Sequence, residues 1–410
     1  MKRPFSPIFA LVSLGAFLTA PAGARTWTDT QGRTLEATLV ESTATEVTLR
    51  LDATGKNATL PLSRLSNADA EFVSKSKKDA PKPGGVSAAA APAGDLNFDA
   101  PWPQSIRLDE NPEIATVTED KVGKRFVYES TNYRFICNVG LSQSVVKGFA
   151  VMFESTYNYC RALPLSISGG KKTDGKYLIL LFETKDQYIE AGGPPSSAGV
   201  YMPGKNTVMV PLTSLGVRQM GSNYMLDRDK TSGTLIHELT HQLTPEPYYS
   251  TGAMGWFSEG LSEYTTATPY RSGLFKVKSN LDDIIAYATE YGKQSNGGRA
   301  LGNKIDAPAL KDFMLQSYSS FTGVNGNFNY GFSLMLTTYF LHMDGAGDAA
   351  RVKKFLEALR AGKHGQAAID VLLDGRSYEE LEEAVAKAWK HKRVEINFRK
   401  SRGGSSGDDA

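Results

Sequence analysis

Between residues 25 and 73, apolar and polar side chains alternate, or nearly alternate, in several short segments. This period of two is typical of strands with one buried face, and it occurs in residues 33–40, 46–51 and 58–62. Ser66, followed three residues later by Asp69, predicts a brief helical turn. A unit of about 50 residues made of short strands is small, and it buries little core by itself.

Residues 98–398 have strand patterns first and helical patterns afterwards. Strands are predicted at residues 126–133, 133–139 and 176–182, and a hairpin at residues 199–210. The continuous apolar run 176–182 predicts a strand that is buried on both faces. A helical pattern follows from about Ser142, capping boxes start helices after Thr184 and Ser377, and the chain is mostly helical after residue 229. This order predicts an α+β domain.

Composition separates these two regions from each other and from the ends of the chain. Residues 74–97 are rich in Lys, Pro, Gly and Ala, which predicts a flexible linker. Residues 1–24 have two basic residues, an apolar run and small residues at the end, the pattern of a bacterial-type signal peptide. We therefore expect an exported protein, periplasmic or extracellular. A membrane anchor is the alternative, but the run is shorter than the roughly 18 residues that a span needs. Residues 399–410 predict a disordered tail.

The overall charge argues against one class of partner. The 410 residues contain 46 Lys and Arg against 44 Asp and Glu, so the formal net charge of +2 gives no reason to expect nucleic-acid binding. Hydrophobic residues make up 41% of the chain, enough for a sizeable core. The richest apolar stretch after the leader, residues 332–343, is too short to span a membrane.

The two cysteines, Cys137 and Cys160, leave two interpretations open. An exported protein can form a disulfide, and a strand usually packs on the helix that follows it, which would bring the two thiols together. Two unpaired, buried thiols are the alternative. Two cysteines are too few for a disulfide scaffold or a Cys-rich zinc module.

Among only five histidines, His237 and His241 have the spacing of metal ligands, H-E-x-x-H. On a helix their imidazoles lie on one face, one turn apart, so they can share one metal ion. Glu238, one residue further round, can reach a water on that ion. The motif therefore predicts a site for one zinc ion.

Residues 256–264 predict a second helix with two carboxylates at positions i and i+4. Glu259 is the candidate third ligand, and Glu263 can accept the free ring N–H of a ligand histidine and fix its tautomer. A solvated acidic face is the alternative, but the neighbouring aromatic residues indicate burial, where unpaired carboxylates are costly. Glu246, between two prolines, is a poorer ligand candidate than a carboxylate on a helix.

These two motifs resemble those of the gluzincin zinc metallopeptidases, in particular the peptidase MA-like branch. The resemblance is carried by His237-Glu238-x-x-His241 and Trp256-x-x-Glu259-Gly260-Leu261-x-Glu263-Tyr264, and it extends loosely over residues 100–398. It implies a zincin-like α+β domain that hydrolyses bonds of a peptide or protein substrate. It also implies that His237, His241 and Glu259 hold the zinc and that Glu238 is the general base.

Gluzincins often use a Tyr or His, besides zinc, to stabilise the carbonyl oxygen under attack. Tyr330 is the candidate here, although an ordinary packing role is the alternative for one of 18 tyrosines. The hairpin at residues 199–210 is predicted to present an edge strand with which an extended peptide can pair. An ordinary sheet edge is the alternative.

Residues 25–73 resemble the SH3-like homology domain found near the start of many exported bacterial proteins. The matching residues are Arg25-Thr26-Trp27-Thr28-Asp29, Gly32-Arg33 and Leu60-Pro61-Leu62-Ser63-Arg64-Leu65-Ser66. The resemblance implies a small all-β barrel with an accessory role. A second function is therefore open, that of a catalytically inactive zincin-fold envelope protein that works through this barrel. The intact Glu238 favours the enzyme, because a protein that only binds metal does not need that carboxylate.

Overall fold

The chain divides into two compact units, Met1–Ser87 and Ala88–Ala410. The boundary lies inside the predicted linker 74–97. The computed structural model describes residues 25–30, 33–42, 46–51, 57–66, 68–73, 96–108, 112–167, 169–227, 233–249, 255–278, 280–291 and 297–400. The predicted signal peptide, most of the predicted linker and residues 401–410 of the predicted tail lie outside these residues.

The smaller unit contains one antiparallel sheet with the order β1-β2-β3-β4. Its strands are β1 (Arg25–Thr28), β2 (Thr34–Ser42), β3 (Glu46–Leu51) and β4 (Asn57–Pro61), followed by η1 (Leu62–Arg64). The three strands predicted from alternation are thus confirmed. Trp27, Val47 and Leu49 are buried in its core. The predicted turn is also present, because Ser66 Oγ accepts the backbone N–H of Asp69 at 3.2 Å.

The larger unit contains a six-stranded sheet with the order β10-β11-β9-β8-β7-β6. Its strands are β6 (Ala115–Asp120), β7 (Arg125–Glu129), β8 (Tyr133–Cys137), β9 (Tyr177–Phe182), β10 (Val200–Met202) and β11 (Thr207–Pro211). The three central strands β8, β9 and β11 are parallel, and the other pairs are antiparallel. The predicted hairpin is β10 and β11, joined by η2 (Pro203–Lys205), and β10 forms one edge of the sheet.

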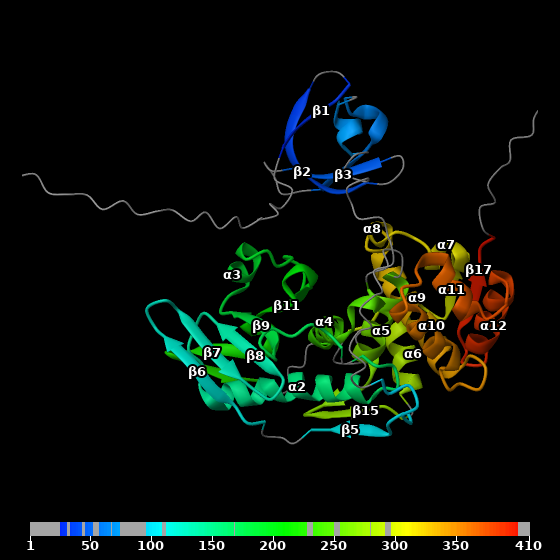
Figure 1. Cartoon of the computed structure of the whole chain (residues 1–410). Helices are drawn as coiled ribbons and strands as arrows, with labels where there is room; N and C mark the ends of the chain where they lie inside the picture. Colours follow the sequence, from blue (N-terminus) through cyan, green and yellow to red (C-terminus); the bar gives the residue numbers. More distant parts are fainter. Residues whose placement is uncertain are drawn as a thin grey trace, which may run out of the picture. The chain divides into compact units, whose positions relative to one another are not determined.

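Helix α2 (Gln143–Ala162) packs along the sheet (Figure 1). Ser142 caps it, since its side chain accepts the backbone N–H of Val145. Phe149 and Phe153 of α2 meet Phe135 of β8 edge to face, with ring centroids 5.3 and 5.0 Å apart. This aromatic contact is part of the main core.

The structure answers two questions about this region: how far β9 is buried and whether the two cysteines pair. In β9, Tyr177, Ile179 and Leu181 are buried, but the alternate residues are only partly buried. The prediction that this strand is buried on both faces is therefore wrong, because its second face is only partly covered. Cys137 and Cys160 are both buried and both free, so the interpretation as two unpaired thiols holds.

After residue 229 the described chain is mostly helical, as predicted, and these helices gather beside the sheet (Figure 1). They are α4 (Gly233–Leu243), α5 (Gly255–Ala267), α6 (Leu281–Thr289), α7 (Leu310–Met314), α8 (Tyr318–Phe321), α9 (Gly326–His342), α10 (Ala350–Arg360), α11 (Gly365–Leu373) and α12 (Tyr378–Lys390). The capping boxes predicted before α3 (Lys185–Glu190) and α12 are both formed.

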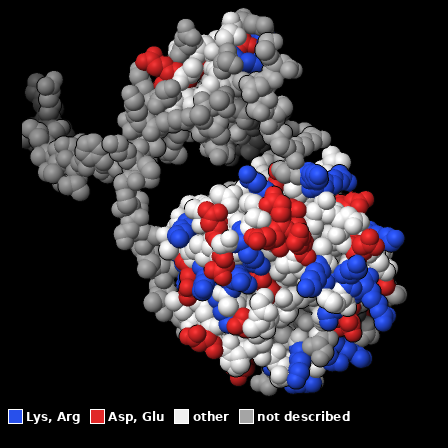
Figure 2. All heavy atoms as spheres, turned by 90° about the vertical axis from the view of Figure 1, so that its right-hand side faces the viewer, with Lys and Arg blue, Asp and Glu red and all other residues white. Residues whose placement is uncertain are grey.

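Smaller elements complete the larger unit. They are β5 (Ser105–Arg107), β12 (Val217–Met220), β13 (Asn223–Leu226), β14 (Tyr270–Arg271), β15 (Leu274–Lys276), β16 (Lys304–Ala307), β17 (Glu395–Phe398), η3 (Leu212–Leu215) and η4 (Glu246–Tyr248). None of the helices in the described residues is both long and apolar enough to cross a membrane. On the face of the larger unit seen in Figure 2, acidic and basic side chains are intermixed, in keeping with the small net charge.

Helix α4 lies between the sheet and the later helices (Figure 1) and contacts β10 and β11 on one side and α5 on another. Helix α5 in turn crosses α9 closely at Gly260. A Cβ atom added there would lie 2.3 Å from Thr337 Oγ1 and 2.5 Å from the carbonyl oxygen of Ser333, so only glycine fits. The sheet edge and α5 thus hold α4 between them.

Candidate metal centre

Helix α4 presents the H-E-x-x-H residues toward α5. Its apolar side, which includes Leu235, Leu239 and Leu243, is fully buried in the main core. His237 and His241 lie one turn apart and are 7% and 9% exposed. The predicted helix is confirmed, and core packing fixes which way both imidazoles face.

Helix α5 is buried along its whole length, which is unusual for a segment that carries two carboxylates. Glu259 is 2% exposed and Glu263 is completely buried. Water cannot solvate these carboxylates, so each must find its partners inside the protein.

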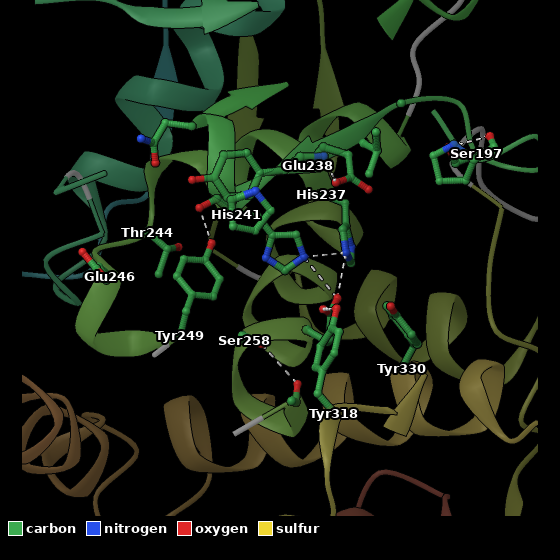
Figure 3. A pocket seen from close by; sticks show the side chains of 18 of the residues that line it. Ser197, His237, Glu238, His241, Thr244, Glu246, Tyr249, Ser258, Tyr318 and Tyr330 are labelled. Atoms are coloured by element: carbon green, nitrogen blue, oxygen red, sulfur yellow. Dashed lines mark hydrogen bonds and ion pairs between the residues drawn. The ribbon is translucent and has the colours of Figure 1, made fainter. Parts of the chain in front are cut away.

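Three atoms from these two helices converge (Figure 3). Nε2 of His237 and Nε2 of His241 lie 3.0 and 3.1 Å from Oε2 of Glu259, and they lie 3.1 Å from each other. His237, His241 and Glu259 therefore form a group that could hold a metal ion.

The spacing of these atoms fits a metal ion with the bond lengths of zinc. Ligand atoms about 2.0–2.1 Å from zinc in tetrahedral geometry lie roughly 3.3 Å from one another. Hydrogen bonds alone suit the arrangement poorly. In a neutral His237 whose Nδ1–H donates to Glu263, Nε2 is an acceptor that faces a second acceptor, Glu259 Oε2. A positive charge between them, either a proton on Nε2 of His237 or a metal ion, removes this repulsion.

Glu263 lies where the sequence analysis expected it, beside the ring nitrogen of His237 that faces away from Glu259. Oε1 of Glu263 is 3.0 Å from Nδ1 of His237. Arg299 holds the same carboxylate, donating from Nε to Oε2 at 2.7 Å and from Nη2 to Oε1. Sequence reasoning missed Arg299, because it lies in a loop 36 residues after Glu263.

His241 also has a partner for its outward nitrogen. Nδ1 of His241 lies 3.2 Å from Oγ of Ser262, and the hydroxyl of Tyr249 donates to the backbone carbonyl of His241. Ser262 follows Glu259 by three residues on α5, so helical spacing could have identified it. Nothing in the sequence pattern singles out Tyr249.

Glu238 reaches the edge of the sheet instead of the three converging atoms. Its Oε2 accepts the backbone N–H of Tyr201 in β10 at 2.7 Å. Burial raises the pKa of Glu238 above its usual value, although His237, His241 and the N–H of Tyr201 oppose this. A carboxylate with a raised pKa is a better proton acceptor at neutral pH.

A cavity of about 680 Å³ lies over these groups, and four tyrosines contribute to its walls: Tyr201, Tyr249, Tyr318 and Tyr330. Tyr330 points into it (Figure 3), with its ring centroid 5.9 Å from that of His237. Its hydroxyl has no hydrogen-bond partner among the described residues. The hydroxyl of Tyr318, which sequence reasoning missed, donates to Oε1 of Glu259 at 2.8 Å.

The carboxylates determine the charge balance of the cluster. Burial by itself lowers the pKa of His237, but its hydrogen bonds to Glu259 and Glu263 outweigh burial and raise the pKa to about 10. Burial would raise the pKa of Glu259, yet the two imidazoles lower it below the usual value. The cluster therefore favours a positive charge among these side chains.

Among the described residues, Glu246 and the three remaining histidines make no hydrogen bond or ion pair with the three converging atoms. Glu246 lines the cavity, but its side chain is exposed and pairs with Lys171 at 2.7 Å. Nε2 of His342 lies 2.8 Å from the hydroxyl of Tyr264, and burial lowers the pKa of His342 to about 4, so its ring is neutral at pH 7. His364 and His391 are exposed.

Comparison of the chain with protein-family models and with curated proteins finds no match.

Proposed function

We propose that this chain is an exported zinc metallopeptidase of the gluzincin type, with a zincin-like catalytic domain at residues 98–398 and an accessory SH3-like barrel. The observation that carries the proposal is the triangle of His237, His241 and Glu259 atoms with 3.0–3.1 Å sides. Glu238 shares the same cavity, so a proton acceptor lies next to the metal ligands.

Bound to these ligands, zinc would act as a Lewis acid and lower the pKa of a bound water to about 7. Glu238 accepts the proton of the attacking water and passes it to the leaving nitrogen. Tyr330, whose hydroxyl is free among the described residues, donates to the carbonyl oxygen as negative charge develops on it. Glu263 holds the imidazole of His237 and Ser262 holds that of His241, so the free energy of metal binding is not used to orient the two rings.

The sheet edge supports a peptide as the substrate. β10 is an edge strand and lines the cavity through Val200 and Tyr201. An extended peptide that pairs with β10 passes beside Glu238, because Glu238 is hydrogen-bonded to this strand. Among the described lining residues outside the metal cluster and Glu238, the charged groups are Lys171 and Glu246, which neutralise each other. The cavity therefore suits an uncharged stretch of peptide.

Glu238→Gln tests the reaction directly. The wild type and the variant are both expected to bind one zinc ion, since Glu238 is not a ligand, whereas peptide cleavage by the variant falls by about 10²–10⁴-fold. Zinc content is measured by elemental analysis, and cleavage is measured by mass spectrometry on a diverse peptide library. Glu246→Asp is the control, because it alters an acid of the same cavity but keeps the charge that balances Lys171, and it is expected to leave cleavage unchanged.

If both proteins bind zinc and neither cleaves any peptide, the enzymatic proposal fails and a metal-binding envelope protein replaces it. If the wild type binds no zinc at all, the metal centre itself is wrong.

A further inference from the structure

Tyr318 makes the second contact of the Glu259 carboxylate. Oε2 of Glu259 faces the two imidazoles at 3.0 and 3.1 Å, while Oε1 accepts the hydroxyl of Tyr318 at 2.8 Å. The two oxygens of one carboxylate therefore have different partners, and Tyr318 determines which oxygen is left for the histidines.

The burial of Glu259 makes this contact important. With Tyr318 in place the residue is 2% exposed, so the hydroxyl of Tyr318 takes the place of water as the partner of Oε1. A buried acceptor that loses its donor destabilises the orientation in which it is held. A carboxylate freed at Oε1 can also rotate about its Cγ–Cδ bond, so Oε2 no longer faces His237 and His241 in a single orientation.

Tyr318 is itself held in place by its surroundings. It begins α8, whose N-terminus is capped by Ser317, and the next turn is anchored by the buried Phe321. Its ring lies against the start of α5, where a Cβ added to Gly255 would be 3.3 Å from a ring carbon. From there the side chain reaches Glu259, to which its hydroxyl donates. Tyr318 and Tyr330 lie side by side in the site (Figure 3).

Tyr330 provides a matched comparison within the same cavity. It is also a tyrosine and lies close to His237, but it makes no hydrogen bond to Glu259. Removing either hydroxyl changes the cavity by one oxygen atom, yet only the hydroxyl of Tyr318 contacts a proposed ligand.

On the basis of the proposed metal site, we infer that Tyr318 is a positioning residue that holds Glu259 with Oε2 toward the two imidazoles and so sets the affinity for zinc. Tyr318 acts through Glu259 and takes no part in proton transfer. Tyr330, in contrast, acts on the substrate and does not affect metal binding.

Zinc affinity, measured by competition with a chromogenic chelator at pH 7, tests this assignment without any substrate. Tyr318→Phe is expected to weaken zinc binding by about 10–100-fold, the effect of losing an outer partner of a metal ligand. Tyr330→Phe is expected to keep the wild-type affinity. In a Glu259→Ala background, Tyr318→Phe is expected to cause no further loss, because its effect passes through Glu259.

Wild-type affinity in Tyr318→Phe would overturn the inference and leave the proposed function standing. An equal, independent loss in the Glu259→Ala background would overturn it too, since Tyr318 would then act by another route. A wild type that binds no zinc would refute the proposed function and this inference together. Tyr318 is 49% exposed, so the Phe variant should fold, and circular dichroism checks this.

Discussion

His237 and His241 each have a separate partner for the ring nitrogen that faces away from Glu259. For His237 the partner is the carboxylate of Glu263, and for His241 it is the hydroxyl of Ser262. Because both partners come from α5, this helix supplies the third proposed ligand and also orients the first two. Such outer partners fix the tautomer of each ring and keep the ligand atoms in position before a metal binds.

The difference between Glu259 and Glu246 gives a prediction at the residue scale. Loss of an outer partner of a metal ligand weakens zinc binding by about 10–100-fold. Glu259→Ala is expected to weaken it further than that, because this variant removes one of the three proposed ligand atoms. Glu246→Ala is expected to leave zinc binding unchanged, since its exposed carboxylate pairs with Lys171. Isothermal titration with zinc measures both. A large loss in Glu246→Ala with little loss in Glu259→Ala would refute the ligand assignment.

At the scale of elements, α4 carries the motif, but its neighbours determine the site. The edge strand β10 binds Glu238 through the N–H of Tyr201, and α5 brings Glu259 to the imidazoles. The position of α5 depends on its close crossing with α9 at Gly260. The positions of the proposed metal ligands and of the proposed general base thus depend on contacts that α4 makes with both α5 and β10.

Gly260→Ala tests the crossing. The added methyl group would overlap Thr337 and Ser333 and push α5 away from α9, with an expected loss of about 1–3 kcal/mol in the free energy of unfolding. Zinc affinity is expected to fall as well, because Glu259 is the preceding residue. Chemical denaturation and zinc titration measure the two effects. Gly204→Ala is the control, because a Cβ at this exposed position has open space. An unchanged stability and affinity in Gly260→Ala would contradict the model of a tight crossing.

At the scale of the whole molecule, the two compact units have separate hydrophobic cores. Trp27, Val47 and Leu49 belong to the core of the smaller unit, whereas α4 and α5 pack into the main core of the larger one. All three proposed ligands lie in the larger unit. A metal ion bound by these residues would therefore stabilise the larger unit directly, and none of its proposed ligands lies in the described part of the smaller unit.

The separation into two units predicts how removal of the metal affects the stability of each unit. Zinc present at about 1,000 times its dissociation constant adds about 4 kcal/mol to the stability of the unit that binds it. A chelator is therefore expected to lower the unfolding temperature of the larger unit while the transition of the smaller unit stays in place, as measured by scanning calorimetry. Glu259→Ala is the control and should respond little to the chelator. Equal shifts of both transitions, or no shift in the wild type, would contradict the assignment.

Local patterns in the sequence predicted the candidate metal-binding residues, because these residues occur as i, i+4 pairs on helices. His237 and His241 face one way at i and i+4, and Glu259 and Glu263 do so on the next helix, whatever the rest of the chain does. The same local logic located the strands of the smaller unit and both capping boxes, whose bonds join residues three apart. These features depend on periodicity and on short-range hydrogen bonds, which the order of residues alone specifies.

Only the tertiary structure decided which distant residues complete the site. Arg299 and Tyr318 reach the carboxylates from 36 and 59 residues away, and Tyr201 reaches Glu238 across 37. Their partners follow from how helices and the sheet pack, and no spacing rule encodes that. Long-range packing also decided that one face of β9 is only partly covered and that Cys137 and Cys160 stay unpaired. The sequence by itself specified the two helical pairs, His237 with His241 and Glu259 with Glu263. Long-range packing brought the two pairs together and added Arg299 and Tyr318 as partners of the carboxylates.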